Sequence, residues 1–359
     1  MFFEIYLIFT FKCAIIFRKV LNLFIKMDLH AILKQVVEHK ASDAHFKTGH
    51  VPTVRLANGS LFQPINVPKL TENDVSELVK KICNQKKLDE LERENEVDVS
   101  YDIEGLSRFR INVYTDYKGL SLAIRVVPHE IPNIVTLGLP EHVKKFTELQ
   151  EGLILVTGPT GHGKSTTLAA LLDQINQTRA CHIVTIEDPI EFLHESKKSI
   201  VSQREVGIHT GSFVNAIKSS LREDPDVIMV GEMRDRETVA AAMTLAETGH
   251  LVFSTVHTID AVQTIDRIID VFSSDQQSQI KAQLAGVLKG IASQRLIPSK
   301  DNKSRVLVCE VMIANDGVRN CILESKINQI YSLMQLGRQD GMQTFEDALQ
   351  ILKKEGRIK

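Results

Sequence analysis

Gly158-Pro-Thr-Gly-His-Gly-Lys-Ser165 decides the fold of this chain, because it matches the phosphate-binding pattern G-x-x-x-x-G-K-[ST]. The apolar run Leu153–Val156 precedes it and the helix-like stretch Ser165–Asn176 follows it. A glycine-rich turn lets backbone N–H groups point at a phosphate, since no Cβ blocks the approach. The stretch therefore predicts a nucleoside triphosphate site. Its expected contact residues are Gly158, Pro159, Thr160, Gly161, His162, Gly163, Lys164, Ser165 and Thr166.

Two side chains of this loop have specific expected roles. In loops of this pattern the lysine, here Lys164, reaches the β- and γ-phosphates of the nucleotide. The hydroxyl of the following residue, Ser165, is suited to ligate Mg²⁺. ATP and Mg²⁺ are therefore the expected cofactors.

Length and composition place the chain among ordinary globular proteins. Its 359 residues predict two domains, each with its own core. A net charge of −2 gives no strong field that would point to a nucleic acid partner, so none is expected. The five cysteines form no C-x-x-C pair, so we expect neither a zinc site nor a disulfide framework. A reducing cytoplasm is then the default location.

Residues 1–26 differ in composition from the rest of the chain. They are rich in Phe, Ile and Leu, but charged residues such as Lys12 and Arg18 interrupt every run well short of the ~20 residues that span a bilayer. A signal peptide would need a charged start and a small-residue cleavage site, and the segment has neither. Three interpretations remain: an extension upstream of the true start, a segment at the membrane surface, or an anchor. We expect translation to start at Met27.

Residues 27–127 are expected to form a small α+β domain. Thr71 fits an N-cap, with Glu72 and Asp74 in the first turn, and the pattern predicts a helix over residues 70–87. Asn58-Gly59 predicts a hairpin turn between two short strands. Three alternating segments predict an antiparallel sheet with one buried face. They cover residues 97–101, 107–114 and 120–127.

The second half of the chain has a different pattern of apolar segments. Pro128-His-Glu-Ile-Pro132 predicts a linker, and residues 128–150 lead into the second domain. From residue 151 to 359, strand-like apolar runs alternate with helix-length stretches, which is typical of a parallel sheet covered by helices. With a phosphate-binding loop after the first strand, an α/β P-loop ATPase core is expected. Its predicted strands cover residues 153–157, 182–186, 227–230 and 251–255.

Three polar residues follow later predicted strands. In an open α/β sheet the ligand lies beyond the carboxyl ends of the strands. Glu232 is therefore suited to hold the hydration shell of Mg²⁺ or to position the attacking water. Glu187 follows another strand and either orders the metal or belongs to a solvated acidic turn. His257 follows a third strand, where it either contacts the γ-phosphate or is a structural histidine.

Three arginines of the first domain are candidates for completing the site. A γ-phosphate in transfer needs added positive charge, often from an arginine that another subunit supplies. Arg108 and Arg110 share one face of a predicted strand, and Arg125 lies on the adjacent strand. The cluster suits an intersubunit arginine finger, and it equally suits ordinary exposed positions on a sheet.

Several longer segments resemble the PilT-type pilus retraction ATPases of the secretion-ATPase superfamily. Ala41-Ser-Asp-Ala-His45 is similar to the family's N-terminal element, and Gly105–Asn112 to its arginine-bearing strand. Thr185–Glu191 resembles the Asp box, and Leu221–Asp235 resembles the Walker B segment. The stretch Ala246–Thr258 resembles the His box. The resemblance covers residues 27–359.

This resemblance implies a fold and an activity. The fold would be α/β, with a PAS-like N-terminal domain and a RecA-like ATPase domain that carries a C-terminal helical region. Six copies would form a ring in which arginines reach the nucleotide. Glu232 would be the catalytic acid, Glu187 would support it and help hold the metal, and His257 would link the nucleotide to domain movement. Hydrolysis would drive type IV pilus retraction and twitching motility, through a platform protein at the inner membrane, with the chain at the cytoplasmic side of the pilus base.

Departures from the family pattern refine this assignment. His162 occupies a loop position usually held by Ser or Thr. The segment Val318-Arg-Asn320 keeps part of a family element whose following residues differ. The ending Gly341–Leu349 is similar to the accessory retraction paralogue, PilU. An accessory subunit of this type is therefore the alternative interpretation. A paralogous retraction ATPase is also an expected partner. A nucleic-acid translocase on the same core would need basic pore loops, for which the composition offers no support.

Overall fold

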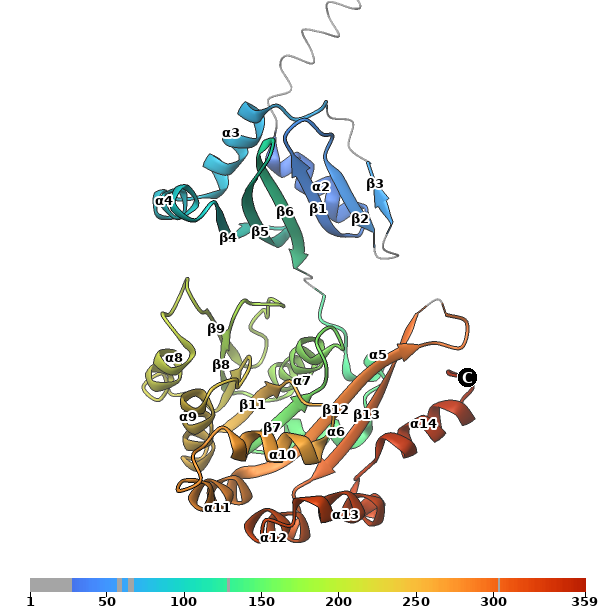
Figure 1. Ribbon diagram of the computed structural model, residues 1–359. Coiled ribbons are helices and arrows are strands. Elements are labelled where there is room, and N and C mark those ends of the chain that lie inside the picture. Colours follow the sequence, from blue (N-terminus) through green and yellow to red (C-terminus); the bar gives the residue numbers. More distant parts are fainter. Residues whose placement is uncertain (1–27, 57–59, 64–67, 128–129, 303) are drawn as a thin grey trace, which may run out of the picture. The chain divides into compact units, whose positions relative to one another are not determined.

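The computed structural model describes residues 28–56, 60–63, 68–127, 130–302 and 304–359. The chain forms two compact units, residues 1–129 and residues 130–359, each drawn in its own colour range in Figure 1. The predicted extension 1–26, the Asn58-Gly59 turn and the first two residues of the predicted linker lie outside the described residues.

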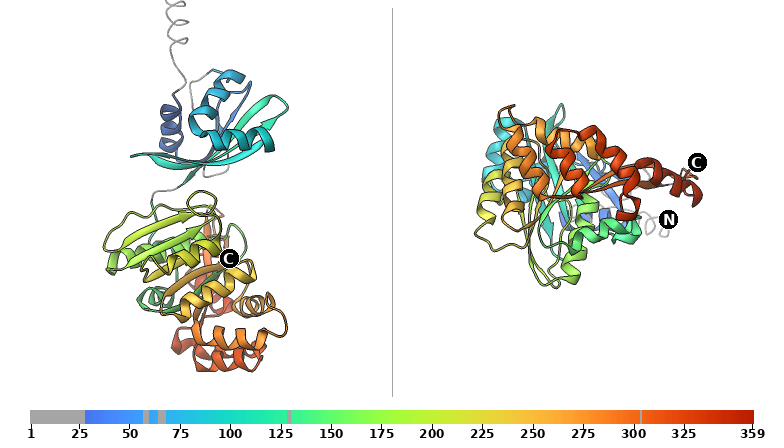
Figure 2. Two further views of the ribbon diagram at one scale, coloured as in Figure 1. Left: turned by 90° about the vertical axis from the view of Figure 1, so that its left-hand side faces the viewer. Right: turned by 90° about the horizontal axis from the view of Figure 1, so that it is seen from below.

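The N-terminal unit is an antiparallel sheet with helices on one face. The six strands follow the order β3-β2-β1-β6-β5-β4, and Figure 2 (left) shows the helices on one side of them. Apolar side chains from both layers form one buried core, including Phe46, Phe109 and Leu33. This arrangement is PAS-like, as expected. The elements are α2 (Leu29–Glu38), β1 (Ala41–Lys47), β2 (Thr53–Leu56), β3 (Leu61–Phe62), α3 (Glu72–Ile82), α4 (Gln85–Glu94), β4 (Glu96–Ile103), β5 (Ser107–Asp116) and β6 (Gly119–Val127).

The helix predicted over residues 70–87 is two helices, which corrects the sequence-based expectation. Thr71 is the N-cap of α3, and its side chain forms a capping box with Asp74, as the sequence indicated. The helix ends at Ile82, and Cys83 has extended backbone. Asn84 then caps a second helix by accepting a hydrogen bond from the Lys87 N–H. The extended backbone at Cys83 thus interrupts the helical run, and the side-chain cap of Asn84 starts a new helix that the apolar spacing does not indicate.

The C-terminal unit is built on a seven-stranded sheet in the order β13-β12-β7-β11-β10-β8-β9. Strands β12, β7, β11, β10, β8 and β9 are parallel neighbours, and β13 joins β12 as an antiparallel hairpin. All residues of β7, β10 and β11 are buried, which explains their continuous apolar sequences. The strands are β7 (Gly152–Thr157), β8 (His182–Glu187), β9 (Ile200–Glu205), β10 (Val227–Val230), β11 (Leu251–Val256), β12 (Leu288–Pro298) and β13 (Arg305–Ile313).

Helices cover both faces of this sheet and give the three layers visible in Figure 1. One face packs against α5 (Ile134–Leu137), α6 (Glu141–Lys145) and α7 (Lys164–Thr178). The other packs against α8 (Phe213–Ser220), α9 (Arg236–Glu247), α10 (Ala261–Asp270), α11 (Gln277–Val287), α12 (Asp316–Leu323) and α13 (Ile330–Leu336). The last helix, α14 (Phe345–Lys354), packs on β13. The unit is a RecA-like α/β domain.

Within the described residues of both units, no helix is long and apolar enough to cross a bilayer.

A buried carboxyl connects the hairpin to the start of α10. Glu310 on β13 is 2% exposed, and its Oε1 accepts a hydrogen bond of 2.9 Å from the Ala261 N–H. The Ser293 hydroxyl on β12 donates to the same carboxyl. Burial raises the pKa of Glu310 from 4.5 to about 7, although the hydrogen bond from Ala261 opposes the shift.

We predict that Glu310 makes stability depend on pH. A carboxyl whose pKa is higher in the folded state contributes stability below the unfolded pKa and loses it as pH rises through the folded value. The wild type should lose this contribution between about pH 4.5 and 7. Glu310→Gln keeps the acceptor oxygen without the charge, so it should remove a pH-dependent loss of up to about 3 kcal/mol.

The measurement is the free energy of unfolding from pH 4.5 to 8, followed by circular dichroism. Glu151→Gln, at an exposed position, is the matched control and should keep the wild-type pH profile. Parallel profiles for wild type and Glu310→Gln would contradict the prediction.

Candidate nucleotide-binding site

The phosphate-binding loop connects the buried strand β7 to α7, as the sequence predicts. Gly158, Gly161 and Gly163 have φ values of 145°, 77° and 85°, a region that side chains with a Cβ rarely adopt. At Gly158 the requirement is also steric, because a Cβ would lie 2.4 Å from the Gln294 carbonyl oxygen of β12. Glycine at these positions therefore lets the loop turn sharply while lying against β12.

Lys164 begins α7 and folds back over the loop. Its Nζ donates to the carbonyl oxygens of Gly158 at 2.8 Å and Pro159 at 3.1 Å. Burial lowers the pKa of the Lys164 ammonium, and the nearby charge of Glu232 opposes that shift. The ammonium is thus held at the loop by two neutral acceptors, which a phosphate group would replace.

Glu232 lies two residues beyond the end of β10, at the same edge of the sheet as the loop. Its side chain is 17% exposed, and two nitrogen-bearing side chains lie close to one of its carboxylate oxygens. Arg234 Nε lies 2.7 Å from Oε2, and His257 Nε2 lies 3.5 Å from the same atom. The carboxylate is therefore oriented by two groups, which is suitable for positioning a water molecule.

His257 connects this carboxylate to the phosphate-binding loop. Its Nδ1 lies 3.4 Å from the Thr160 hydroxyl, while its Nε2 faces Glu232. Burial lowers the pKa of His257, and the charge of Lys164 lowers it further. Both effects favour the neutral imidazole, which can bridge the two groups by hydrogen bonds without adding charge.

A cavity of about 490 Å³ lies against these side chains. Its two charged lining residues, Arg234 and Arg267, were not among the sequence-predicted site residues. Arg234 falls within the Walker B segment, two residues after Glu232, so the sequence could have predicted that it lies near the site. Arg267 lies on α10, and only the fold brings it here. The lining residues are Thr160, Met233, Arg234, Val256, His257 and Arg267.

Glu187 ends β8 and is 6% exposed, so it does not lie in a solvated turn. One oxygen accepts from the Thr185 hydroxyl at 2.7 Å and from the Gln203 amide at 3.1 Å. The other accepts from the Glu191 N–H at 3.3 Å, and burial raises the pKa of Glu187. The backbone N–H of Gly231 bonds the carbonyl of Ile186, which brings Glu187 next to the Walker B segment.

The oxygen groups at this edge fit a magnesium ion. Within the described residues, no group of three or more Asp, Glu, His or Cys side chains is placed to hold a metal by itself. Mg²⁺ in nucleotide sites usually takes one or two protein oxygens together with the phosphates. The Ser165 hydroxyl in the first turn of α7 and the Glu232 carboxylate would supply such oxygens, whereas both oxygens of the buried Glu187 already accept hydrogen bonds.

The three arginines lie on one face of the N-terminal sheet. Arg110 is directly opposite Arg125 in the β5–β6 register, and Arg108 is two residues away on the same face. The intervening Phe109 points into the core. Arg125 Nε lies 3.0 Å from Asp43, and Arg108 is 6% exposed. The strand-face grouping predicted from the sequence is thus confirmed, and their catalytic role stays a prediction.

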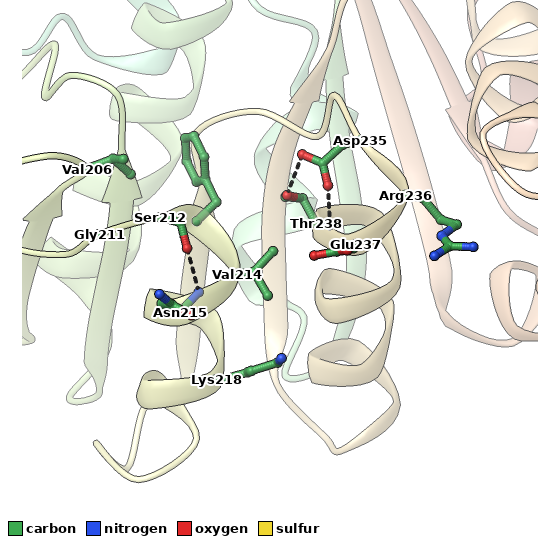
Figure 3. Close-up of a pocket in the computed structure, with 11 residues that line it drawn as sticks. Val206, Gly211, Ser212, Val214, Asn215, Lys218, Asp235, Arg236, Glu237 and Thr238 are labelled. Atoms are coloured by element: carbon green, nitrogen blue, oxygen red, sulfur yellow. Dashed lines mark hydrogen bonds between the residues drawn. The ribbon is translucent and has the colours of Figure 1, made fainter.

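A second cavity, of about 660 Å³, lies between the N-terminal ends of α8 and α9 (Figure 3). Both helices are capped by their own side chains, since Ser212 accepts from the Asn215 N–H and Asp235 from the Thr238 N–H. Lys218 points from α8 toward α9 in this view. No residue of the phosphate-binding loop lines this cavity. The nucleotide is therefore assigned to the edge that carries Lys164.

Comparisons with known proteins show the family of this chain. Residues 22–355 match the family described as "Type II/IV secretion system protein". The "Type IV pilus retractation ATPase PilT" of Pseudomonas aeruginosa is 44% identical over 332 residues, covering 92% of this chain and 96% of that protein. A "Twitching motility protein" of Neisseria gonorrhoeae is 46% identical over 294 residues, covering 82% and 79%.

A solved structure gives the same result at the level of the fold. The "Crystal Structure of the Pilus Retraction Motor PilT and Bound ADP" superposes with a TM-score of 0.86 and 47% identity, covering 93% of this chain and 95% of that one. The "Type IV pilus ATPase PilU" of Pseudomonas aeruginosa is less similar, with 36% identity over 332 residues, 92% of this chain and 86% of that protein. This chain therefore belongs to the type II/IV secretion system protein family and, within it, to the PilT-type ATPases.

Proposed function

We infer that this chain is an ATP-hydrolysing motor that drives type IV pilus retraction and twitching motility. The observation that carries this proposal is the meeting of the phosphate-binding loop, Glu232 and His257 at one sheet edge. The relationship to the PilT retraction ATPases supplies the biological setting. PilU, the alternative, is the weaker match over the same length of this chain.

Each residue of the site has a distinct part in hydrolysis. The Lys164 ammonium leaves the carbonyls of Gly158 and Pro159 and binds the β- and γ-phosphates. Ser165 would hold Mg²⁺ in part, and the bound ion would neutralise charge of the phosphates. Glu232 positions the attacking water and accepts its proton. His257 keeps Glu232 and Thr160 in a fixed relation, so that a change at the γ-phosphate moves the segment after β11.

We further propose that the active form is a ring of six copies. The arginines on this face of the N-terminal sheet then supply positive charge to a nucleotide bound by another subunit. The ring works from the cytoplasmic side at the inner membrane, against a platform protein at the pilus base. A paralogous retraction ATPase is a further partner of such a ring.

The first prediction from the proposed function separates nucleotide binding from hydrolysis. Lys164→Ala should abolish turnover, because the phosphates lose the ammonium that reaches them. Glu232→Gln should keep ATP binding and lower kcat at least about 100-fold, since the amide cannot accept the proton of the attacking water. The measurements are ATP titration by calorimetry and steady-state phosphate release.

The control for this experiment is Glu237→Gln, an exposed acid in the first turn of α9. It lies close to Glu232 in sequence, and its turnover should stay near that of the wild type. Normal turnover in Glu232→Gln would remove the catalytic assignment.

The second prediction tests whether an arginine acts between subunits. Arg110→Ala should lower turnover about 10³-fold or more if Arg110 is the finger. Rings mixed from Arg110→Ala and Lys164→Ala chains should regain part of the activity. At some interfaces an intact phosphate-binding loop then meets an intact arginine from the neighbour.

Arg93→Ala, an exposed arginine on α4, is the matched control and should behave as the wild type. Unchanged turnover in Arg110→Ala would leave Arg108 or Arg125 as the finger. An inactive mixture of two separately inactive variants would contradict action between subunits.

The third prediction concerns the cell. Deletion of the gene should leave abundant surface pili that do not retract, because assembly continues without withdrawal. Counting pili by electron microscopy and following twitching on agar measure both effects. Loss of pili would point to assembly, and retraction that persists with reduced force would point to the accessory role.

A further inference from the structure

The phosphate-binding loop lies against the last part of β12, where no strand of the described residues pairs on that side. Strand β12 pairs with β7 as far as Ser293, which lies opposite Thr157. At Thr157 the chain leaves β7 and enters the loop. Beyond Ser293, β12 continues to Pro298, and in the described part of the chain its one strand partner there is β13. The edge of β12 that β7 would have covered is thus covered by the loop.

His162 satisfies one backbone hydrogen-bonding group of this edge, the N–H of Leu296. Its Nδ1 accepts a hydrogen bond of 3.0 Å from the backbone N–H of Leu296. A backbone N–H that is buried without an acceptor would be costly, so the imidazole replaces the missing ladder bond. Serine or threonine at this position would not reach, because their hydroxyl oxygen is one bond from Cβ and Nδ1 is two bonds from it.

Two further contacts hold the backbone of the loop. Gln294, which is 1% exposed, donates its Nε2 to the His162 carbonyl at 2.6 Å. Arg305 on β13 donates its Nη1 to the Gly161 carbonyl at 3.2 Å. Both donors come from the β12–β13 hairpin, seen in orange in Figure 1.

The direction of these carbonyls determines the direction of the neighbouring amides. In a trans peptide, the C=O and the N–H of the same plane point opposite ways. When Gln294 holds the His162 carbonyl toward β12, the N–H of Gly163 points away from β12. When Arg305 holds the Gly161 carbonyl, the N–H of His162 is turned in the same manner. The hairpin therefore turns these two amides away from itself, and backbone amides of such loops bind anions.

We propose that His162 and Gln294 are positioning residues that fix the phosphate-binding loop on β12 and thereby raise its affinity for nucleotide. Holding a loop in its binding conformation removes part of the ordering cost that binding would otherwise carry. The imidazole thus performs a task that the usual hydroxyl cannot perform. This inference rests on the proposed nucleotide site, and it assigns a purpose to the loop's unusual residue.

The test compares His162→Ser with His162→Asn in the full-length chain. The Asn side-chain oxygen is two bonds from Cβ, as is Nδ1, so it can accept from Leu296 N–H, and serine cannot. His162→Ser should weaken ADP binding by about three- to tenfold, the worth of one hydrogen bond. His162→Asn should recover most of this loss. In steady-state hydrolysis, KM for ATP should rise more than kcat falls in the serine variant.

A second variant tests the other contact. Gln294→Met has a similar volume and no amide, so it should also weaken ADP binding. Thermal unfolding of each variant, with and without ADP, separates lost affinity from lost folding. His50→Ser, an exposed histidine of the N-terminal unit, is the matched control and should bind as the wild type does.

Two results would overturn the proposal. Equal ADP affinity in wild type, His162→Ser and His162→Asn would show that the contact does not position the loop. Equal weakening in the serine and asparagine variants would show that the ring, and not its acceptor nitrogen, matters. A wild-type chain that fails to bind ADP would instead contradict the proposed function, so the two failures are distinguishable.

Discussion

The parallel register of β7, β11, β10 and β8 is the constraint on which the site depends. These strands pair in register along their whole buried lengths, so their carboxyl ends meet at one edge. Every segment that leaves this edge brings its first polar residues to the same place. The loop, Glu187, Glu232 and His257 are far apart in the chain, and only the ladder hydrogen bonds make them neighbours.

The sequence predicts this part of the fold well because burial and chemistry agree there. Strands buried on both faces read as continuous apolar runs, and β7, β10 and β11 lie where those runs occur. The polar residue that ends each run is then a site residue for a geometric reason. The proximity of Glu232 and His257 follows from this pattern, and the structure confirms it with a separation of 3.5 Å.

Other features could not be read from spacing because they depend on contacts between distant segments. The apolar period over residues 70–87 does not reveal the extended Cys83 and the Asn84 cap, which separate α3 from α4. Arg267 reaches the cavity only because α10 follows β11 back along the sheet. The partner of His162 is Leu296, which lies 134 residues further along the chain. No local pattern encodes such a backbone N–H, since every residue except proline has one.

The position of Lys164 has a consequence for which anions the loop admits. In the structure its ammonium already donates to two carbonyl oxygens of the loop, so an incoming anion must exchange places with them. A lone monophosphate offers few new contacts in return, whereas a polyphosphate gains the ammonium, the loop amides and the start of α7 together. We therefore expect the loop to bind a polyphosphate more tightly than a single phosphate ion.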